Sequence, residues 1–190
     1  MGLFDAFKKE EVVGTKVLVC SVDARFSQPM NSDSQMYKRL YPATVANVFS
    51  NLDQLLQAIA QKYDVVHFYS DVSPEGTISD GSGKSISGHQ LIDACCDANV
   101  KVLWIASDNK PDAYTKGFNA KGKKINLVMT IRRLGPYFPL FLANLLEKIS
   151  AGESMPAAWA AMNPQGGDSV QPDTPECIFF AGRGKVVLKK

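Results

Sequence analysis

YDVVHFYSD (Tyr63–Asp71) and KVLWIASDN (Lys101–Asn109) are the two stretches that decide the fold class. In each, a run of apolar and β-branched residues ends in polar residues, a pattern typical of a strand buried on both faces. In open parallel sheets, ligands and catalytic groups gather outside the carboxyl ends of the strands. The first candidates for chemistry are therefore the polar residues after the two runs: Ser70, Asp71, Ser107 and Asp108.

Apolar runs and helical spacing of apolar residues predict further strands and helices on both sides of this pair. The expected strands cover residues 15–23, 43–50, 64–69, 101–106, 124–131, 177–182 and 185–188. The expected helices cover residues 33–40, 51–61, 88–98, 112–119, 136–150 and 155–162. Strands that alternate with helices imply βαβ units with right-handed crossovers. The predicted fold class is α/β, with a mainly parallel sheet of about six strands flanked by helices.

Two polar segments are expected to be irregular. Residues 24–32 are predicted as a loop, with Pro29 and Asn31 as helix breakers. DGSGKS (Asp80–Ser85) ends like a phosphate-binding loop, but Ile78 stands where a Walker A motif needs glycine. We therefore expect a flexible glycine-rich turn there, within a loop or short hairpin, and no nucleotide site.

Composition is that of an ordinary globular protein in one domain. The 190 residues are 45% hydrophobic and 21% charged, with a net charge of +2, which gives no strong attraction to nucleic acid or membrane. No stretch has the length of a membrane span or the pattern of a signal peptide. The four cysteines are not arranged as a disulfide framework, which indicates a reduced, cytoplasmic setting. Without a CxxC motif, and with only two histidines, no metal site is expected, and no cofactor is expected either.

The first residues of the chain, MGLFDAFKKEE, place Leu3, Phe4 and Phe7 on one helical face. Such a segment can touch a membrane or dock on the body of its own protein, and docking is the commoner outcome for so short a stretch. A basic cluster elsewhere is interpreted as a solvated rim, because a nucleic-acid footprint is usually denser. Its members are Lys116, Lys121, Lys123, Lys124, Arg132 and Arg133.

Cys20, at the end of the first expected strand, is the one cysteine with a candidate catalytic position. A nucleophilic cysteine needs a histidine within reach. His67 falls inside a strand, where a hydrogen-bonded core histidine is expected, and His89 falls at a helix start. We therefore expect Cys20 to be a small buried apolar residue.

Several segments, taken in order, resemble the CHAT family of caspase-like cysteine peptidases, within the caspase/gingipain/separase clan. YDVVHFYSD resembles the family strand "DVVHFAGHG", and SGHQLIDACCDANVKVLWIAS resembles the helix and strand that end in "LVVLSAC". MTIRRLGPYFPLFLANLLEKISAGESMPAAW is similar to the family's helix pair, and CIFFAGRGKVVL is similar to its closing segment. The similarity covers most of Val17–Leu188 and implies a caspase-like α/β fold.

The resemblance also locates the catalytic dyad of the family. The second histidine of "HFAGHG" is the general base, and the cysteine of "LSAC" is the nucleophile. In this chain Asp71 takes the position of the base, Val72 that of the glycine after it, and Ser107 that of the nucleophile, while His67 matches the first, structural histidine. A serine hydroxyl is far less nucleophilic than a thiolate, and a carboxylate is a weak base for its proton. Both substitutions together imply that peptidase activity is lost.

These residues lead to the hypothesis of a caspase-like domain without peptidase activity, which regulates or scaffolds by binding a protein or peptide. The binding cleft would be lined by Asp23, Arg25, Asp71, Ser107 and Asp108. Two alternatives stay open: a hydrolase that uses Ser107, or Cys20 with an incoming base, and a flavodoxin-like domain that binds a small ligand. The analogy with caspases also suggests a homodimer through a sheet edge.

Overall fold

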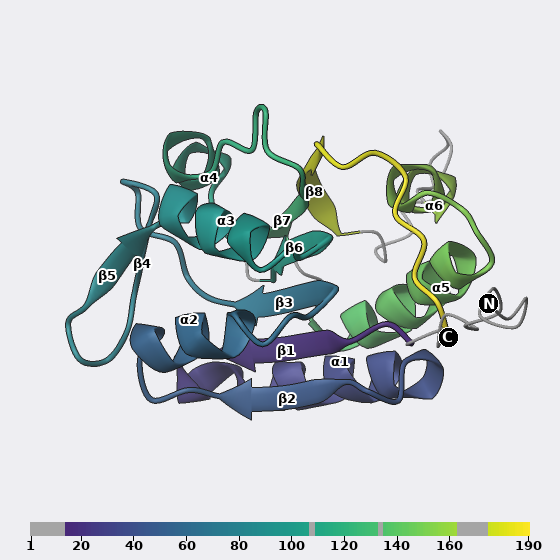
Figure 1. Cartoon of the computed structure of the whole chain (residues 1–190), viewed down its shortest axis with the longest axis horizontal. Helices are drawn as coiled ribbons and strands as arrows, with labels where there is room; N and C mark the ends of the chain where they lie inside the picture. The colour runs from purple at the N-terminus through teal and green to yellow at the C-terminus, as the bar shows by residue number, and fades with distance from the viewer. Residues whose placement is uncertain (1–13, 107–108, 133–134, 163–174) are drawn as a thin grey trace, which may run out of the picture.

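The structure is a computed structural model that describes residues 14–106, 109–132, 135–162 and 175–190 (Figure 1). A six-stranded sheet has the strand order β2-β1-β3-β6-β7-β8, in which the first five strands are parallel and β8 is antiparallel to β7. The α/β class and the mainly parallel sheet of about six strands are thus confirmed. The strands are β1 Val17–Ser21, β2 Val45–Val48, β3 Val65–Tyr69, β6 Val102–Ile105, β7 Asn126–Arg132 and β8 Glu176–Ala181.

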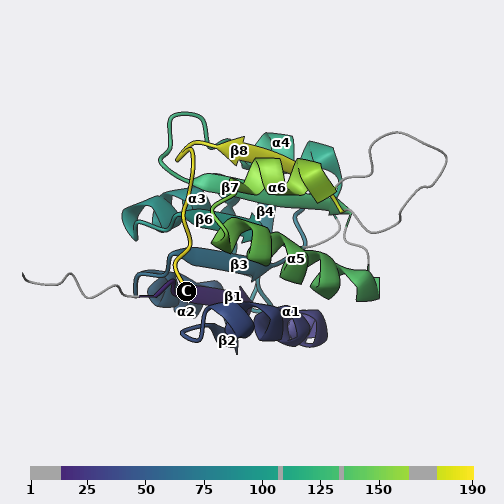
Figure 2. The ribbon, with the colours of Figure 1, turned by 90° about the vertical axis from the view of Figure 1, so that its right-hand side faces the viewer.

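Helices cover both faces of this sheet (Figure 1, Figure 2). One face packs against α2 (Leu52–Ile59), α3 (Gly88–Asp97) and α4 (Pro111–Gly117). The other face packs against α1 (Ser27–Leu40), α5 (Phe138–Ser150) and α6 (Met155–Met162). The short 3-10 helices η1 (Ala24–Phe26) and η2 (Gly135–Tyr137) lead into α1 and α5.

Burial on both faces explains why the central strands form where the apolar runs predicted them. Every residue of β1, β3 and β6 is buried. Because side chains alternate along a strand, Val66 and Leu103 face one helical layer while His67 and Trp104, one residue further along, face the other. Each large apolar side chain buried in this way stabilises the fold by about 1.5–3 kcal/mol.

Side-chain caps fix the starts of two helices. The side chain of Asn51 caps α2 by accepting a hydrogen bond from Gln54 N at 3.0 Å. Ser87 caps α3 in a capping box, in which its own N–H donates to Gln90 Oε1 at 2.8 Å. These caps hold the starts of α2 and α3 beside the carboxyl ends of the strands.

The prediction of a loop over residues 24–32 was wrong. The chain turns through η1 after Asp23, and α1 begins at Ser27 rather than at residue 33. Pro29 is the third residue of α1. The N–H groups in the first turn of a helix have no acceptor within the helix, so a proline there costs no hydrogen bond. Proline therefore does not break this helix, and Met30 and Asp33 are buried against the sheet.

The prediction of a strand over residues 185–188 was also wrong. A turn follows β8, in which Gly184 has φ +70° and its N–H donates to Ala181 O at 3.0 Å. The chain then crosses the amino-terminal edge of the sheet, buries Leu188 in the core and ends beside β1, where Thr15 N donates to Lys189 O. In the described part of the chain, the outer edge of β8 consequently has no strand beside it.

The polar segment after β3 folds as a hairpin of β4 (Thr77–Ser79) and β5 (Ser85–Ser87), so the expected turn over residues 80–85 is confirmed. Asp80 fixes its tip by accepting hydrogen bonds from Ser82 Oγ at 2.6 Å and from Leu52 N, at the start of α2, at 2.8 Å. These hydrogen bonds, that of Ser82 first, lower the pKa of the Asp80 carboxyl below its ordinary value. The hairpin is thus anchored to the body of the protein.

Backbone contacts between glycines position α4 against this hairpin. A Cβ on Gly117 would lie 2.0 Å from Gly76 O, and a Cβ on Gly88 would lie 2.5 Å from Gly117 O. Gly76 also has φ +78°, a conformation that favours glycine. The three backbones can approach this closely only because none of the three residues has a side chain.

We predict that Gly117→Ala destabilises the protein by about 1–3 kcal/mol, because its methyl group would force the backbone of Gly76 away. The measurement is urea unfolding followed by circular dichroism. Gly81→Ala is the matched control, since a Cβ there meets no atom within 4 Å, and we expect a change within about 0.5 kcal/mol. Equal stability of the two variants would contradict the close glycine packing.

Candidate functional site

Three of the five predicted cleft residues come together at the carboxyl edge of the sheet. Asp23 and Arg25 follow β1, and Asp71 follows β3, which lies beside β1. Arg25 Nη2 lies 2.6 Å from Asp23 Oδ2 and 3.0 Å from Asp71 Oδ2, and Arg25 Nε donates to Asp23 Oδ2 at 2.8 Å. The guanidinium therefore joins the loops that follow two adjacent strands.

This carboxylate–guanidinium cluster lies at the surface. The side chains of Arg25 and Asp71 are 71% and 57% exposed. The hydrogen bond from Arg25 lowers the pKa of the Asp23 carboxyl, and the hydrogen bonds to Asp23 and Asp71 raise the pKa of Arg25. Because solvent screens exposed ion pairs, the cluster orients its side chains more than it stabilises the fold.

A cavity of about 380 Å³ adjoins the cluster, between η1 and the tip of the β4–β5 hairpin. Its lining includes the carboxylate residues Asp23 and Asp80 and the hydroxyl residue Ser79. A volume of this size is within the range of small-ligand pockets. The carboxyl edge thus offers an acidic recess beside an exposed guanidinium.

The remaining two predicted cleft residues, Ser107 and Asp108, lie outside the described residues. The chain is described again at Asn109, a buried residue whose amide bonds across to the segment after β3. Asn109 Oδ1 accepts a hydrogen bond from Val72 N at 2.8 Å, and Asn109 Nδ2 donates to Ser70 O at 3.3 Å. One side chain therefore fixes the backbone on both sides of Asp71.

A second half of this network extends from Asn109 to the next strand. Asn109 Nδ2 lies 2.8 Å from Tyr114 Oη, which donates to Thr130 O at 2.7 Å, and Thr130 Oγ1 donates to Ile105 O at 3.1 Å. The buried network connects the ends of β3, β6 and β7 with α4. Sequence reasoning missed it, although Asn109 closes one of the two deciding stretches.

His67 occupies the core, as predicted. Its side chain is fully buried and stacks between Tyr69 and Trp104, with ring centroids 5.2 and 4.8 Å away. His67 Nδ1 lies 3.1 Å from Tyr37 Oη, and His67 Nε2 lies 4.0 Å from the buried carboxylate of Asp33, to which the Tyr69 hydroxyl donates. This histidine has a structural position, remote from the exposed cluster.

Cys20 and His67 face opposite sides of the sheet. Cys20 is fully buried in the core that α2 and α3 cover, whereas His67 contacts the layer of α1 and α5. Burial raises the pKa of the Cys20 thiol well above its ordinary value, so the thiolate that a nucleophile needs is disfavoured. The prediction that Cys20 is a small buried apolar residue is confirmed, and His67 cannot serve it as a base.

The aromatic run at the start of α5 divides between core and surface. Phe138 and Phe141 are buried, but Tyr137 is 57% exposed. Tyr137 lies in η2, before α5 begins to pack on the sheet. Of the expected basic rim, Lys123 forms an ion pair with Asp93 at 2.5 Å, while Arg133 lies outside the described residues.

Two other kinds of site find no support in the described residues. They contain no group of three or more histidine, cysteine or acidic side chains that could hold a metal ion. None of their helices has both the length and the apolar character that crossing a bilayer requires. The fold and the carboxyl-edge cluster define the class as an α/β protein with a polar cleft. No family model and no curated protein matches the chain.

We predict that Asn109→Ala destabilises the protein by about 2–3 kcal/mol, because it leaves the buried Val72 N–H without its acceptor. Urea unfolding measures the loss, and faster hydrogen exchange at the Val72 amide locates it. Asn47→Ala, at an exposed position of β2, is the control, for which we expect a change within about 0.5 kcal/mol. Unchanged exchange at Val72 would contradict the bridging role of Asn109.

We further predict that stability falls as pH rises above about 8.5, where unfolded cysteine ionises. The pKa of Cys20 is raised in the folded state, so the thiol stays protonated while the unfolded chain loses its proton. Each such group lowers the free energy of unfolding by about 1.4 kcal/mol per pH unit. Cys20→Ala should flatten the slope between pH 8.5 and 10 more than Cys96→Ala, whose thiol is half-buried. Equal slopes would count against deep burial of Cys20.

Proposed function

We propose that this chain is a CHAT-type, caspase-like domain that has no peptidase activity and binds a protein or peptide at the carboxyl edge of its sheet. The observation that carries the proposal is the state of the backbone beside Asp71. The N–H of Val72 is engaged by Asn109, and the Asp71 carboxylate is engaged by Arg25. An enzyme of acyl transfer would use an N–H donor and a base at these two positions. Here both groups already bind other residues of the protein.

The first argument concerns the base. A general base must accept the proton of the nucleophile within hydrogen-bond reach. Asp71 Oδ2 already accepts a hydrogen bond from Arg25 Nη2 at 3.0 Å, so the carboxylate is engaged by a guanidinium. Asp71 is therefore placed to hold a cation.

The second argument concerns the oxyanion. Stabilising a tetrahedral intermediate requires N–H donors that point at the developing charge. The N–H of Val72, at the position where the family has glycine, donates instead to the buried amide of Asn109. Moving it toward a substrate would break the network that also includes Tyr114 and Thr130. The rigidity of this network favours a binding surface over a catalytic one.

The charges at the edge indicate the chemistry of the partner. Asp23 and Asp71 contribute two carboxylates to one guanidinium, that of Arg25, and Asp80 adds a third in the adjoining cavity. A lysine or arginine side chain of a partner would find an acidic recess about 380 Å³ in volume. We therefore expect a peptide segment with a basic residue to bind best.

To test the loss of activity, the protein is incubated with a library of fluorogenic peptides. We expect no turnover, and therefore no effect of Ser107→Ala, because neither the serine nor the carboxylate replaces a Cys–His dyad. Asp71→His with Ser107→Cys tests whether the scaffold still supports the dyad. Turnover by the natural sequence that Ser107→Ala abolishes would overturn the proposal in favour of the serine hydrolase.

Binding is tested with the same peptides in immobilised form. Asp23→Asn with Asp71→Asn removes both carboxylates that face Arg25, and we expect at least about 10-fold weaker binding of the selected basic peptides at low salt. Glu75→Gln is the control, because Glu75 is exposed and follows β3 as Asp71 does. We expect its binding affinity to change by less than about 2-fold. A library without selective binders, or equal effects of the two variants, would contradict a binding role for this edge.

A further inference from the structure

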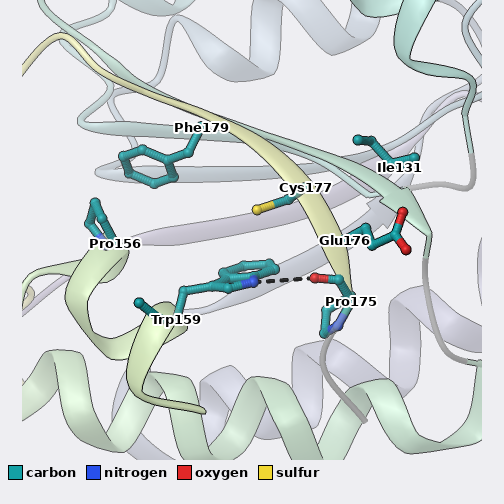
Figure 3. Close-up of a pocket in the computed structure, with 8 residues that line it drawn as sticks. Ile131, Pro156, Trp159, Pro175, Glu176, Cys177 and Phe179 are labelled. Atoms are coloured by element: carbon teal, nitrogen blue, oxygen red, sulfur yellow. Dashed lines mark hydrogen bonds between the residues drawn. The ribbon is translucent and has the colours of Figure 1, made fainter. Parts of the chain in front are cut away.

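Charges are distributed unevenly over the described residues. The carboxyl edge has the carboxylates of Asp23, Asp71 and Asp80. A cavity of about 540 Å³ between β8 and α6 has Glu176 among otherwise uncharged lining residues (Figure 3). Basic residues gather instead at the opposite edge of the sheet, where the parallel strands begin. We call this edge, which lies outside the site of the proposed function, the amino edge.

Backbone hydrogen bonds align the residues that begin neighbouring strands at the amino edge. Lys16 precedes β1, Asp64 precedes β3 and Lys101 precedes β6. Asp64 N donates to Lys16 O, and Lys101 N donates to Asp64 O, each at 2.8 Å. Asn126, the first residue of β7, donates its N–H to Lys101 O at 2.9 Å, and Lys124 comes two residues earlier. Lysines therefore lie at the starts of β1, β6 and β7 along one line.

The carboxyl-terminal tail of the chain adds a second row of cations. β8 is antiparallel to β7 and ends at the amino edge, from which the tail crosses to β1 (Figure 2). Val186 and Leu188 pack on the core, whereas Lys185, Val187 and Lys189 are exposed, and Val187 is 51% exposed. This alternation is that of an extended segment. The tail thus presents a lysine, a valine and a lysine on one side.

Most of these cations have no ion pair with another described residue. Two of them are engaged, since Lys101 lies 2.7 Å from Asp64 and Lys123 lies 2.5 Å from Asp93. The other lysines of the amino edge are exposed and form no salt bridge with a described carboxylate. They are Lys16, Lys62, Lys121, Lys124, Lys185 and Lys189.

The fold, rather than the composition, creates this basic edge. The net charge of the whole chain is only +2, because acidic residues elsewhere offset the lysines. The five residues of β3 separate the carboxyl edge from the amino edge by about 17 Å. Salt screens exposed charges beyond about 8 Å at physiological ionic strength. The carboxyl edge therefore does not cancel the potential of the amino edge, where the lysines outnumber the exposed carboxylates Asp97 and Glu147.

We propose that the amino edge docks the protein on an anionic membrane surface. Clustered lysines are attracted to the negative charge of acidic lipid headgroups. Between the two tail lysines, the exposed Val187 offers an aliphatic side chain to the headgroup region. Docking in this orientation directs the carboxyl edge away from the membrane. The proposal does not depend on the proposed function, because the two edges have no residue in common.

A nucleic acid, the alternative polyanion, fits this edge less well. Proteins that bind single strands without reading their sequence stack the bases on aromatic side chains. Among the described residues, the exposed large aromatic side chain is that of Tyr137, which follows β7 at the carboxyl edge. Nucleic-acid recognition also favours arginine, whose fork binds two phosphate oxygens, whereas the exposed cations of this edge are mainly lysines. Lysines beside an aliphatic side chain suit a lipid surface better.

Sedimentation of the full chain with lipid vesicles tests the proposal. We expect binding to phosphatidylcholine vesicles that contain about 30% phosphatidylserine, and at least about 10-fold weaker binding to phosphatidylcholine alone. Lys185→Gln with Lys189→Gln should weaken binding to the acidic vesicles at least about 10-fold, because each lysine near such a surface contributes about 5-fold.

Lys84→Gln with Lys110→Gln is the matched control. It removes the same charge from the hairpin and from the segment after β6, which lie toward the carboxyl edge. We expect a change of less than about 2-fold, because these lysines lie beyond the screening length from the docked surface. Equal effects of the two double variants, or no binding to the acidic vesicles, would overturn the proposal.

A single-stranded oligonucleotide distinguishes a lipid surface from a nucleic acid. Val187→Ser should weaken binding to the acidic vesicles about 3-fold, because it removes the aliphatic contact, and should change binding to the oligonucleotide by less than about 1.5-fold. Displacement of the protein from the vesicles by the oligonucleotide at equal total charge would assign the edge to nucleic acid. That result, or an unchanged vesicle affinity of Val187→Ser, overturns the proposal.

Discussion

The amide of Asn109 bridges the chain segments that leave β3 and β6, and the carboxyl edge of the sheet depends on this bridge. It accepts from Val72 N, donates to Ser70 O and contacts Tyr114 Oη, so it fixes the backbone on both sides of Asp71. The network is buried, where a hydrogen bond is strong and an unmade one is costly. Hydrogen bonds to Asn109 therefore fix the backbone from which the Asp71 side chain reaches Arg25.

This support gives the edge a definite chemical character. The N–H of Val72, a main-chain donor at the carboxyl edge, is used within the protein, while the charged side chains of Asp23, Arg25 and Asp71 remain at the surface. Catalysis requires groups that are preorganised and uncommitted, whereas recognition requires only a fixed pattern of charge and shape. The proposal of a binding role in place of peptidase chemistry rests on these same contacts.

The sequence predicted those features that depend on local pattern. Apolar runs located β3 and β6, and spacing located α2, α3 and α5, because each signal lies within one element. The start of α1 was missed, since Pro29 reads as a breaker unless its place in the first turn is known. The Asn109–Tyr114–Thr130 network was missed because it depends on strand order, and no local signal states which loops will meet.

Helices cover both faces of the sheet. The edges of the sheet are therefore the surfaces where another segment can meet the main chain. The carboxyl edge has polar loops that close over one another through Asn109 and Arg25. The β2 margin is short and exposes Asn47. The β8 margin differs because the antiparallel strand is followed by a turn at Gly184 and the chain then leaves the sheet, so that within the described residues the outer edge of this mostly apolar strand has no partner strand. An open strand edge of this kind can pair with a further strand, which is why natural proteins commonly protect such edges.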